Sequence, residues 1–194
     1  MTDRKPIAAG KSSFEIVDEQ AVFDQLQLKG GEIIIDAGSG VGNYAMALAG
    51  SAGSGSRIYA FDLWQEGIDE LNRRIADSGL KNLTADRADV SQRIPLGDGA
   101  ADVLLMVTVF HDLVEDGKGE GALREAARVL RPEGRLVIVE FNKEEGTPGP
   151  PLHIRLAPEE LDSLVEPVGF AGPSRAKAGP YAYISIYRRE SAGA

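Results

Sequence analysis

Short apolar runs alternate with amphipathic segments along most of the chain. The runs typical of strands lie at residues 32–37, 57–63, 82–89, 101–110 and 135–141. Runs that are apolar at almost every position are expected of strands buried on both faces, and 101–110 is expected at the centre of the sheet. Apolar side chains recur at helical spacing in 42–50, 64–78 and 120–131. This alternation predicts an α/β fold with a doubly wound, mostly parallel sheet and helices on both faces.

The two ends of the chain follow other patterns. Residues 142–157 are rich in glycine and proline and predict a loop, and a helix is expected from Pro158. Segments 170–177 and 181–188 flank Gly179-Pro180 and predict a hairpin. Residues 14–28 predict a helix over the pocket. We therefore expect a cap segment at 1–31 and a single globular domain at 32–190.

Composition narrows the classes of function. The 194 residues are 43% hydrophobic, carry a formal charge of −9 and contain no cysteine. The negative charge argues against a nucleic-acid partner, and the lack of cysteine excludes thiolate chemistry. The first twenty residues lack the apolar segment of a signal peptide, and no apolar run has the length of a membrane span. We expect a cytoplasmic protein with no membrane partner, and oligomeric state is not readable from the sequence.

A glycine-rich loop follows the first apolar run. It contains Gly38, Ser39, Gly40 and Gly42, directly after Asp36 and Ala37. A dinucleotide-binding loop would have glycine where this chain has Asn43, and the Asp36 carboxylate would oppose a pyrophosphate. S-adenosylmethionine (SAM) instead carries a sulfonium and an ammonium group, which a carboxylate attracts. The loop favours SAM, with a nicotinamide-dependent reductase as the weaker alternative and plain turn glycines as the structural one.

Further candidate cofactor contacts end the following strands. Asp62 is placed to accept hydrogen bonds from ribose hydroxyls, and Asp89 from an adenine amino group. Leu63 and Val90 would flank the adenine ring, and Thr108 would complete the cofactor-binding set. Asp89 could instead cap a helix. Acidic residues at the ends of three successive strands, counting Asp36, are more specific than any one glycine.

These motifs resemble the class I SAM-dependent methyltransferases. The resemblance covers roughly residues 30–188 and rests on the segments DAGSGVG, FDL, RADV and AARVLRPEGRLVIVEF. It is greatest to small methyltransferases of the type found in ubiquinone and menaquinone biosynthesis. It implies a Rossmann-like sheet of seven strands with an antiparallel C-terminal strand. The family's motifs specify the cofactor well and the methyl acceptor hardly at all.

Catalytic and substrate-binding candidates follow the fourth and fifth strands, and one more lies in the N-terminal segment. His111 is the candidate general base, since its unperturbed pKa lies near neutrality, or it forms a wall of the pocket. Phe14, His153 and Arg155 are candidate substrate contacts, while loop packing could also explain His153. A metal site formed by Asp112, Glu140 and Asn142 is conceivable, but no ligand spacing supports it, and we expect none.

The sequence thus predicts an enzyme that transfers the SAM methyl group to a small-molecule acceptor. A SAM-binding sensor or partner subunit without catalysis is the alternative, because the motifs specify binding and not turnover.

Overall fold

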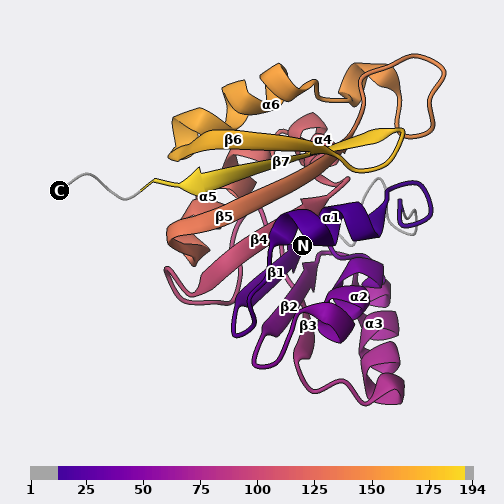
Figure 1. Cartoon of the computed structure of the whole chain (residues 1–194), viewed down its shortest axis with the longest axis vertical. Coiled ribbons are helices and arrows are strands. Elements are labelled where there is room, and N and C mark those ends of the chain that lie inside the picture. Colours follow the sequence, from indigo (N-terminus) through magenta and orange to yellow (C-terminus); the bar gives the residue numbers. More distant parts are fainter. Residues whose placement is uncertain (1–12, 191–194) are drawn as a thin grey trace.

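The computed structural model describes residues 13–190 and contains one seven-stranded sheet in the order β3-β2-β1-β4-β5-β7-β6 (Figure 1). The strands are β1 (Ile33–Ala37), β2 (Arg57–Asp62), β3 (Leu83–Arg87), β4 (Ala101–Val107), β5 (Leu130–Phe141), β6 (Phe170–Lys177) and β7 (Ala182–Arg189). Strands β1 to β5 pair in parallel, and β7 pairs antiparallel with both β5 and β6. The predicted fold class, with its seven strands and antiparallel C-terminal strand, is confirmed.

The helices cover both faces of the sheet. They are α1 (Glu19–Leu26), α2 (Asn43–Ser51), α3 (Gln65–Ser78), α4 (Phe110–Glu115), α5 (Gly119–Val129) and α6 (Pro158–Val165), with short 3-10 turns at Leu152–Ile154 and Glu166–Val168. One hydrophobic cluster joins α1, α2 and α3 to one face, and a second joins α4, α5 and α6 to the other. Because side chains on successive strand residues point to opposite faces, Ile34 belongs to the first cluster and Ile35 to the second.

Helix α1 lies against a face of the sheet. Its Val22 and Leu26 are fully buried in the first cluster, and Asp18 caps its first turn by accepting from the backbone N–H of Ala21. Of the described N-terminal residues, Ser13 and Phe14 approach the carboxyl ends of the strands. The remainder of the predicted cap segment, residues 1–12, falls outside the described residues.

Two boundaries differ from the sequence prediction. The fourth strand ends at Val107, and the apolar residues that follow turn into α4, so Phe110 packs from a short helix. The segment Pro132-Glu133-Gly134, expected to separate a helix from a strand, lies within β5. There Glu133 adopts a positive φ of 62°, and the register between β4 and β5 shifts between Ala101 and Val103. An irregular stretch of this kind lets a strand include a proline, which has no N–H to donate.

The site for a ligand follows from this topology. The chain crosses from β1 to β2 on one side and later to β4 on the other, so the strand order reverses beside β1. Ligands of such sheets bind beyond the carboxyl ends of the strands at this point. Among the described helices, none is long and apolar enough to cross a membrane.

Candidate cofactor and active site

The glycine-rich loop joins the end of β1 to the start of α2. Its backbone is held by N–H groups of Gly38 and Ser39, which donate to the Phe61 carbonyl at 2.7 and 3.1 Å. Gly38 has φ +82°, and a Cβ there would lie 2.7 Å from the Val109 side chain. Gly40 has φ +55° and open space where its Cβ would point. The loop needs glycine at both positions, and it brings the residues after β4 directly beside it.

Asp36 lies below this loop on β1. Its side chain is only 2% exposed, and its Oδ2 has no hydrogen-bond partner among the described residues. Burial, and then the charge of Asp62, raises the pKa of the Asp36 carboxyl to about 7, although an N–H of Ala45 opposes the shift. A buried carboxylate in this setting is stabilised by a cationic ligand.

Asp62 ends β2 and connects two parts of the site. Its Oδ2 accepts from the N–H of Gly40 at 2.8 Å, and its Oδ1 from the N–H of Trp64 at 2.8 Å. Burial raises its pKa, and these two N–H groups oppose the shift. Each carboxylate oxygen retains acceptor capacity, as a ribose diol requires. Leu63 lies between Asp62 and Trp64 and is partly exposed.

Asp89 lies two residues beyond the end of β3. Its carboxylate accepts from the N–H and hydroxyl of Ser91 and from the side-chain amide of Gln92. Burial raises its pKa, but the hydrogen bonds from Ser91 outweigh burial, and the pKa lies below its usual value. The structure therefore shows a turn-capping role, while the adenine contact stays a prediction. Val90 is 6% exposed and packs in the second hydrophobic cluster.

Thr108 directly follows β4 and adopts a positive φ of 51°, which is rare for a β-branched residue. Its hydroxyl donates to the Ser13 hydroxyl at 2.7 Å, and the Ser13 and Tyr44 hydroxyls lie 3.3 Å apart. The ring of Phe14 meets the ring of Tyr44 edge-on, with centroids 5.1 Å apart. Ser13 and Phe14 are thereby attached to Thr108 after β4 and to Tyr44 of α2, and contact of Phe14 with an acceptor stays a prediction.

His111 lies in the first turn of α4 and is paired with Glu140 at the end of β5. Its Nδ1 is 2.6 Å from Glu140 Oε2, and its backbone N–H donates to Glu140 Oε1 at 3.0 Å. Its Nε2 lies 3.6 Å from Asp112 Oδ1. Burial lowers the pKa of the imidazole, but the hydrogen bond and charge of Glu140 outweigh it and hold the pKa above its ordinary value. Glu140 itself is 1% exposed.

From the sequence, Glu140 was expected at most as a metal ligand. Within residues 13–190 no group of three or more His, Asp or Glu side chains is arranged to hold a metal ion. The signal available in the sequence was an acidic residue at the end of an otherwise apolar strand. Such a residue has to find a buried partner, and its partner comes from the neighbouring strand end.

Arg155 has contacts different from those expected of a substrate-binding residue. It is 5% exposed, and its guanidinium donates to the carbonyls of Pro150, Asn142, Glu144 and Thr147 and to the Thr147 hydroxyl. Its donors are thus used to hold the loop between β5 and the 3-10 turn. His153 lies on that turn and is exposed. Contact of either residue with a substrate stays a prediction.

The residues present fit SAM. The buried Asp36 carboxylate complements its positive charge, and the Ser39 hydroxyl is buried without a hydrogen-bond partner among the described residues. The backbone of Gly40 leaves open space above the loop, and the loop contains no basic side chain that would favour a phosphate. Asp62 is held at the end of the neighbouring strand, where the adenosine half would lie.

The fold is that of the class I SAM-dependent methyltransferases. Residues 35–138, more than half of the chain, match the family described as "Methyltransferase domain", and the chain belongs to this family. The predicted class of protein and its cofactor are confirmed at this level.

Individual relatives agree with this assignment. The chain is 36% identical over 63% of its length to a demethylmenaquinone methyltransferase of Clavibacter sepedonicus, and 30% identical over 61% of its length to the ubiquinone/menaquinone biosynthesis C-methyltransferase UbiE of Paraburkholderia phymatum. The matched parts are 44% and 47% of those two proteins, so the chain spans less than half of either. Among solved structures, a SAM-dependent methyltransferase from Aquifex aeolicus superimposes with a TM-score of 0.82 at 28% identity, covering 92% of this chain and 93% of that one.

Proposed function

We propose that this protein transfers a methyl group from SAM to a small-molecule acceptor, with a ring of the quinone-precursor type as the first class to test. The buried Asp36 carboxylate below the glycine loop is the observation that carries cofactor binding. The quinone-type acceptor is supported by the two relatives whose names specify such substrates. A cytoplasmic location remains part of this proposal and rests on the sequence.

The bound cofactor would supply a methyl group activated by the positive charge of its sulfur. The residues of this chain would bind, orient and exclude water. Asp36 and the glycine loop would hold the amino-acid half, and Asp62 the ribose. The attachment of Ser13 and Phe14 beside the loop, together with the segment held by Arg155, would keep water from the acceptor.

His111 would act on the acceptor's proton. In this proposal Glu140 accepts the hydrogen bond of His111 Nδ1–H, which leaves Nε2 as the atom that takes a proton. Val109, two residues earlier, already packs against Gly38, so the segment that carries His111 passes beside the cofactor loop. Glu140 is a positioning residue, because it acts through the imidazole and would touch neither cofactor nor acceptor.

Calorimetric titration with SAM, S-adenosylhomocysteine and NADH tests the cofactor assignment. We expect micromolar or tighter binding of the two adenosyl ligands, loss of at least tenfold in affinity in Asp62→Asn, and no binding of NADH. Asp77→Asn, which changes an exposed acid in the last turn of α3, is the matched control and should bind as the wild type does. Absence of adenosyl binding by the folded protein would contradict the proposal.

Turnover is a separate question from binding. Formation of S-adenosylhomocysteine in the presence of hydroxylated aromatic and quinol acceptors, with a methylated product detected by mass, would establish methyl transfer. His111→Gln should retain cofactor affinity and lose turnover. Tight adenosyl binding with no product from any acceptor would instead favour the sensor or partner-subunit alternative.

A further inference from the structure

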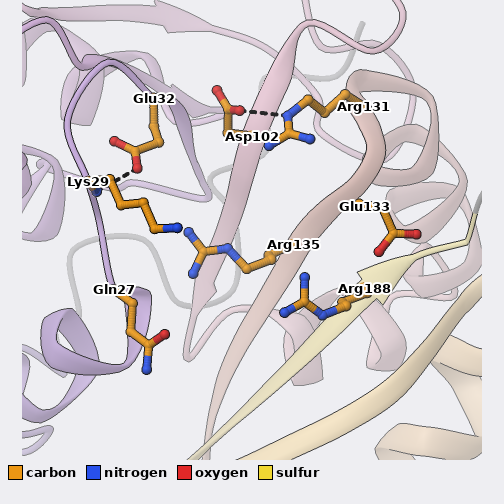
Figure 2. A pocket seen from close by; sticks show the side chains of 8 residues that line it. All are labelled: Gln27, Lys29, Glu32, Asp102, Arg131, Glu133, Arg135 and Arg188. Atoms are coloured by element: carbon orange, nitrogen blue, oxygen red, sulfur yellow. Dashed lines mark hydrogen bonds and ion pairs between the residues drawn. The ribbon is translucent and has the colours of Figure 1, made fainter.

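A pocket lies at the amino ends of the parallel strands, the opposite end from the glycine loop. It has a volume of about 220 Å³ and is formed by the amino ends of β1, β4 and β5 and the last residues of β7 (Figure 2). Its lining residues are all polar or charged, and the basic ones are Lys29, Arg131, Arg135 and Arg188. A concentration of basic side chains is unexpected in a chain whose formal charge is −9.

Two of these arginines are paired on neighbouring strands of the sheet. Arg135 of β5 and Arg188 of β7 are directly paired in the antiparallel register. Like charges at paired positions destabilise a sheet unless something between them compensates. Figure 2 shows Lys29 extending across the pocket toward Arg135, with Arg188 pointing to the same centre.

Two of the three acidic residues of the pocket have other contacts. Asp102 pairs with Arg131 at 2.7 Å and also accepts from the backbone N–H of Ile33. Glu32 accepts from the backbone N–H of Lys29 and from the Ser56 hydroxyl. Glu133 lines the pocket but makes no ion pair with any described basic side chain. The pocket therefore has three acidic and four basic side chains. One of the basic side chains, Arg131, is already neutralised by Asp102.

No carboxylate within the described residues lies at ion-pair distance from Lys29, Arg135 or Arg188. Arg135 is the most constrained of the three, because its side chain is partly buried and donates to the Leu26 carbonyl. Burial lowers the pKa of Arg135; the charge of Glu32 opposes the shift, and the smaller effect of the Arg188 charge adds to it. Arg135 is thus held in place by the fold, and the exposed side chains of Lys29 and Arg188 line the same pocket as further positive charges.

We propose that this pocket binds a small oxyanion of the phosphate class, either free or as the end group of a small metabolite. Guanidinium forks match the geometry of phosphate oxygens, and a multiply charged anion would neutralise the three cations together. The pocket is smaller than the roughly 300–1,000 Å³ of ordinary small-molecule sites, which favours a group of this size over a nucleotide. The proposal is independent of methyl transfer, since the two sites lie at opposite ends of the strands.

Thermal unfolding in inorganic phosphate tests the proposal, with sodium chloride used to match ionic strength. We expect phosphate at ten times its dissociation constant to raise the Tm of the wild type by about 3–6 °C. Arg188→Gln, at an exposed position, should lose this rise. In phosphate-free buffer of low ionic strength the same variant should be more stable than the wild type, because the repulsion between the paired arginines is removed.

Arg73→Gln is the matched control, since it removes an exposed arginine on α3, a helix that does not line the pocket. It should keep the full response to phosphate. Calorimetric titration with phosphate and with pyrophosphate then separates a free anion from a larger phosphorylated ligand by their relative affinities. An equal rise of Tm in chloride, or an equal response of Arg188→Gln and the wild type, would overturn the proposal.

Discussion

His111 and Glu140 are joined twice: the imidazole Nδ1 lies 2.6 Å from one carboxylate oxygen, and the backbone N–H of His111 donates to the other at 3.0 Å. The carboxylate is therefore fixed by the same residue whose ring it orients. Because both side chains are at least 96% buried, the charge of Glu140 acts on the imidazole with little screening by water.

Replacing Glu140 with Gln should lower the pKa of His111, since the charge and hydrogen bond of Glu140 are what raise it. If His111 is the base, wild-type kcat rises with pH through this raised pKa. In the variant the rise should begin at lower pH, and the maximal kcat should be about 10- to 100-fold smaller. The kcat–pH profile measures both effects.

Nuclear magnetic resonance of the imidazoles provides a readout that does not depend on activity. The chain has only two histidines, so the signals of His111 can be assigned by comparison with a His153→Gln variant. His111 should titrate above the ordinary pH range of a histidine in the wild type and move toward lower pH in Glu140→Gln. An unmoved His111 titration would show that Glu140 does not control its charge.

Binding of the cofactor product should depend on the ionisation of Asp36. With a pKa near 7, this carboxyl is mostly protonated at pH 6, and a cationic ligand has to displace the proton. Affinity for S-adenosylhomocysteine should therefore rise about tenfold between pH 6 and 7.5 and then level off. Calorimetry in buffers of different ionisation enthalpy should detect proton release on binding at pH 6.5, and Asp36→Asn should abolish it.

Ionisation of Asp36 favours ligand binding, but in the ligand-free protein it lowers the stability of the fold. Its folded-state pKa is raised, so the stability it contributes is present below the unfolded pKa near 4 and is lost as pH rises through 7. Asp36→Asn should thus gain stability relative to the wild type between pH 5 and 8, by at most about 4 kcal/mol. Urea unfolding at the two pH values checks this, and a constant difference between the proteins would contradict it.

Arg155→Lys should loosen the segment that follows β5. A lysine has three donors on one atom and cannot reproduce the contacts that the guanidinium makes with four carbonyls and a hydroxyl. We expect the free energy of unfolding to fall by about 2–4 kcal/mol, and KM for the acceptor to rise more than KM for SAM.

Amide hydrogen exchange of residues 143–150 should report the loosening directly. Arg124→Lys is the matched control, since Arg124 is 70% exposed and pairs with exposed Glu120, and it should change stability by less than about 0.5 kcal/mol. Unchanged exchange in Arg155→Lys would show that the loop is held by other contacts.

The sequence predicted the parts of the site that depend on local order. Asp36 and Asp62 lie at the ends of buried strands, and the glycines follow β1. Strand periodicity alone therefore places these residues at the carboxyl ends of the strands. The pair of His111 and Glu140 could not, because the two residues are 29 positions apart and meet only when β4 and β5 become neighbours. Helix α4 was missed since its apolar residues continue the pattern of the strand before it.

Arg155 and Pro132 illustrate a second limit. An arginine in a loop rich in glycine and proline is usually exposed, and its burial here depends on how the loop carbonyls converge. Proline is usually outside a strand, and its inclusion in β5 depends on an irregular register with β4. Both depend on tertiary contacts that residue type and spacing do not encode.

Gly38→Ala tests the contact that brings the segment after β4 against the cofactor loop. Two costs combine there: a positive φ of 82°, and a Cβ that would lie 2.7 Å from the Val109 side chain. Gly79→Ala isolates the first cost, because Gly79 has φ +72° and no atom within 4 Å of its added Cβ. We expect Gly79→Ala to cost about 1 kcal/mol and Gly38→Ala to cost about 2–4 kcal/mol.

Truncating Val109 to Ala should then separate steric contact from backbone strain. In the double variant Gly38→Ala/Val109→Ala, the steric part of the cost should disappear, which leaves a coupling energy of about 1–2 kcal/mol in a double-mutant cycle measured by urea unfolding. SAM affinity should fall at least tenfold in Gly38→Ala and recover only in part in the double variant, because the added methyl group still lies on the loop. Strictly additive effects would mean that the loop relaxes away from Val109, and the contact would then not position the segment that carries His111.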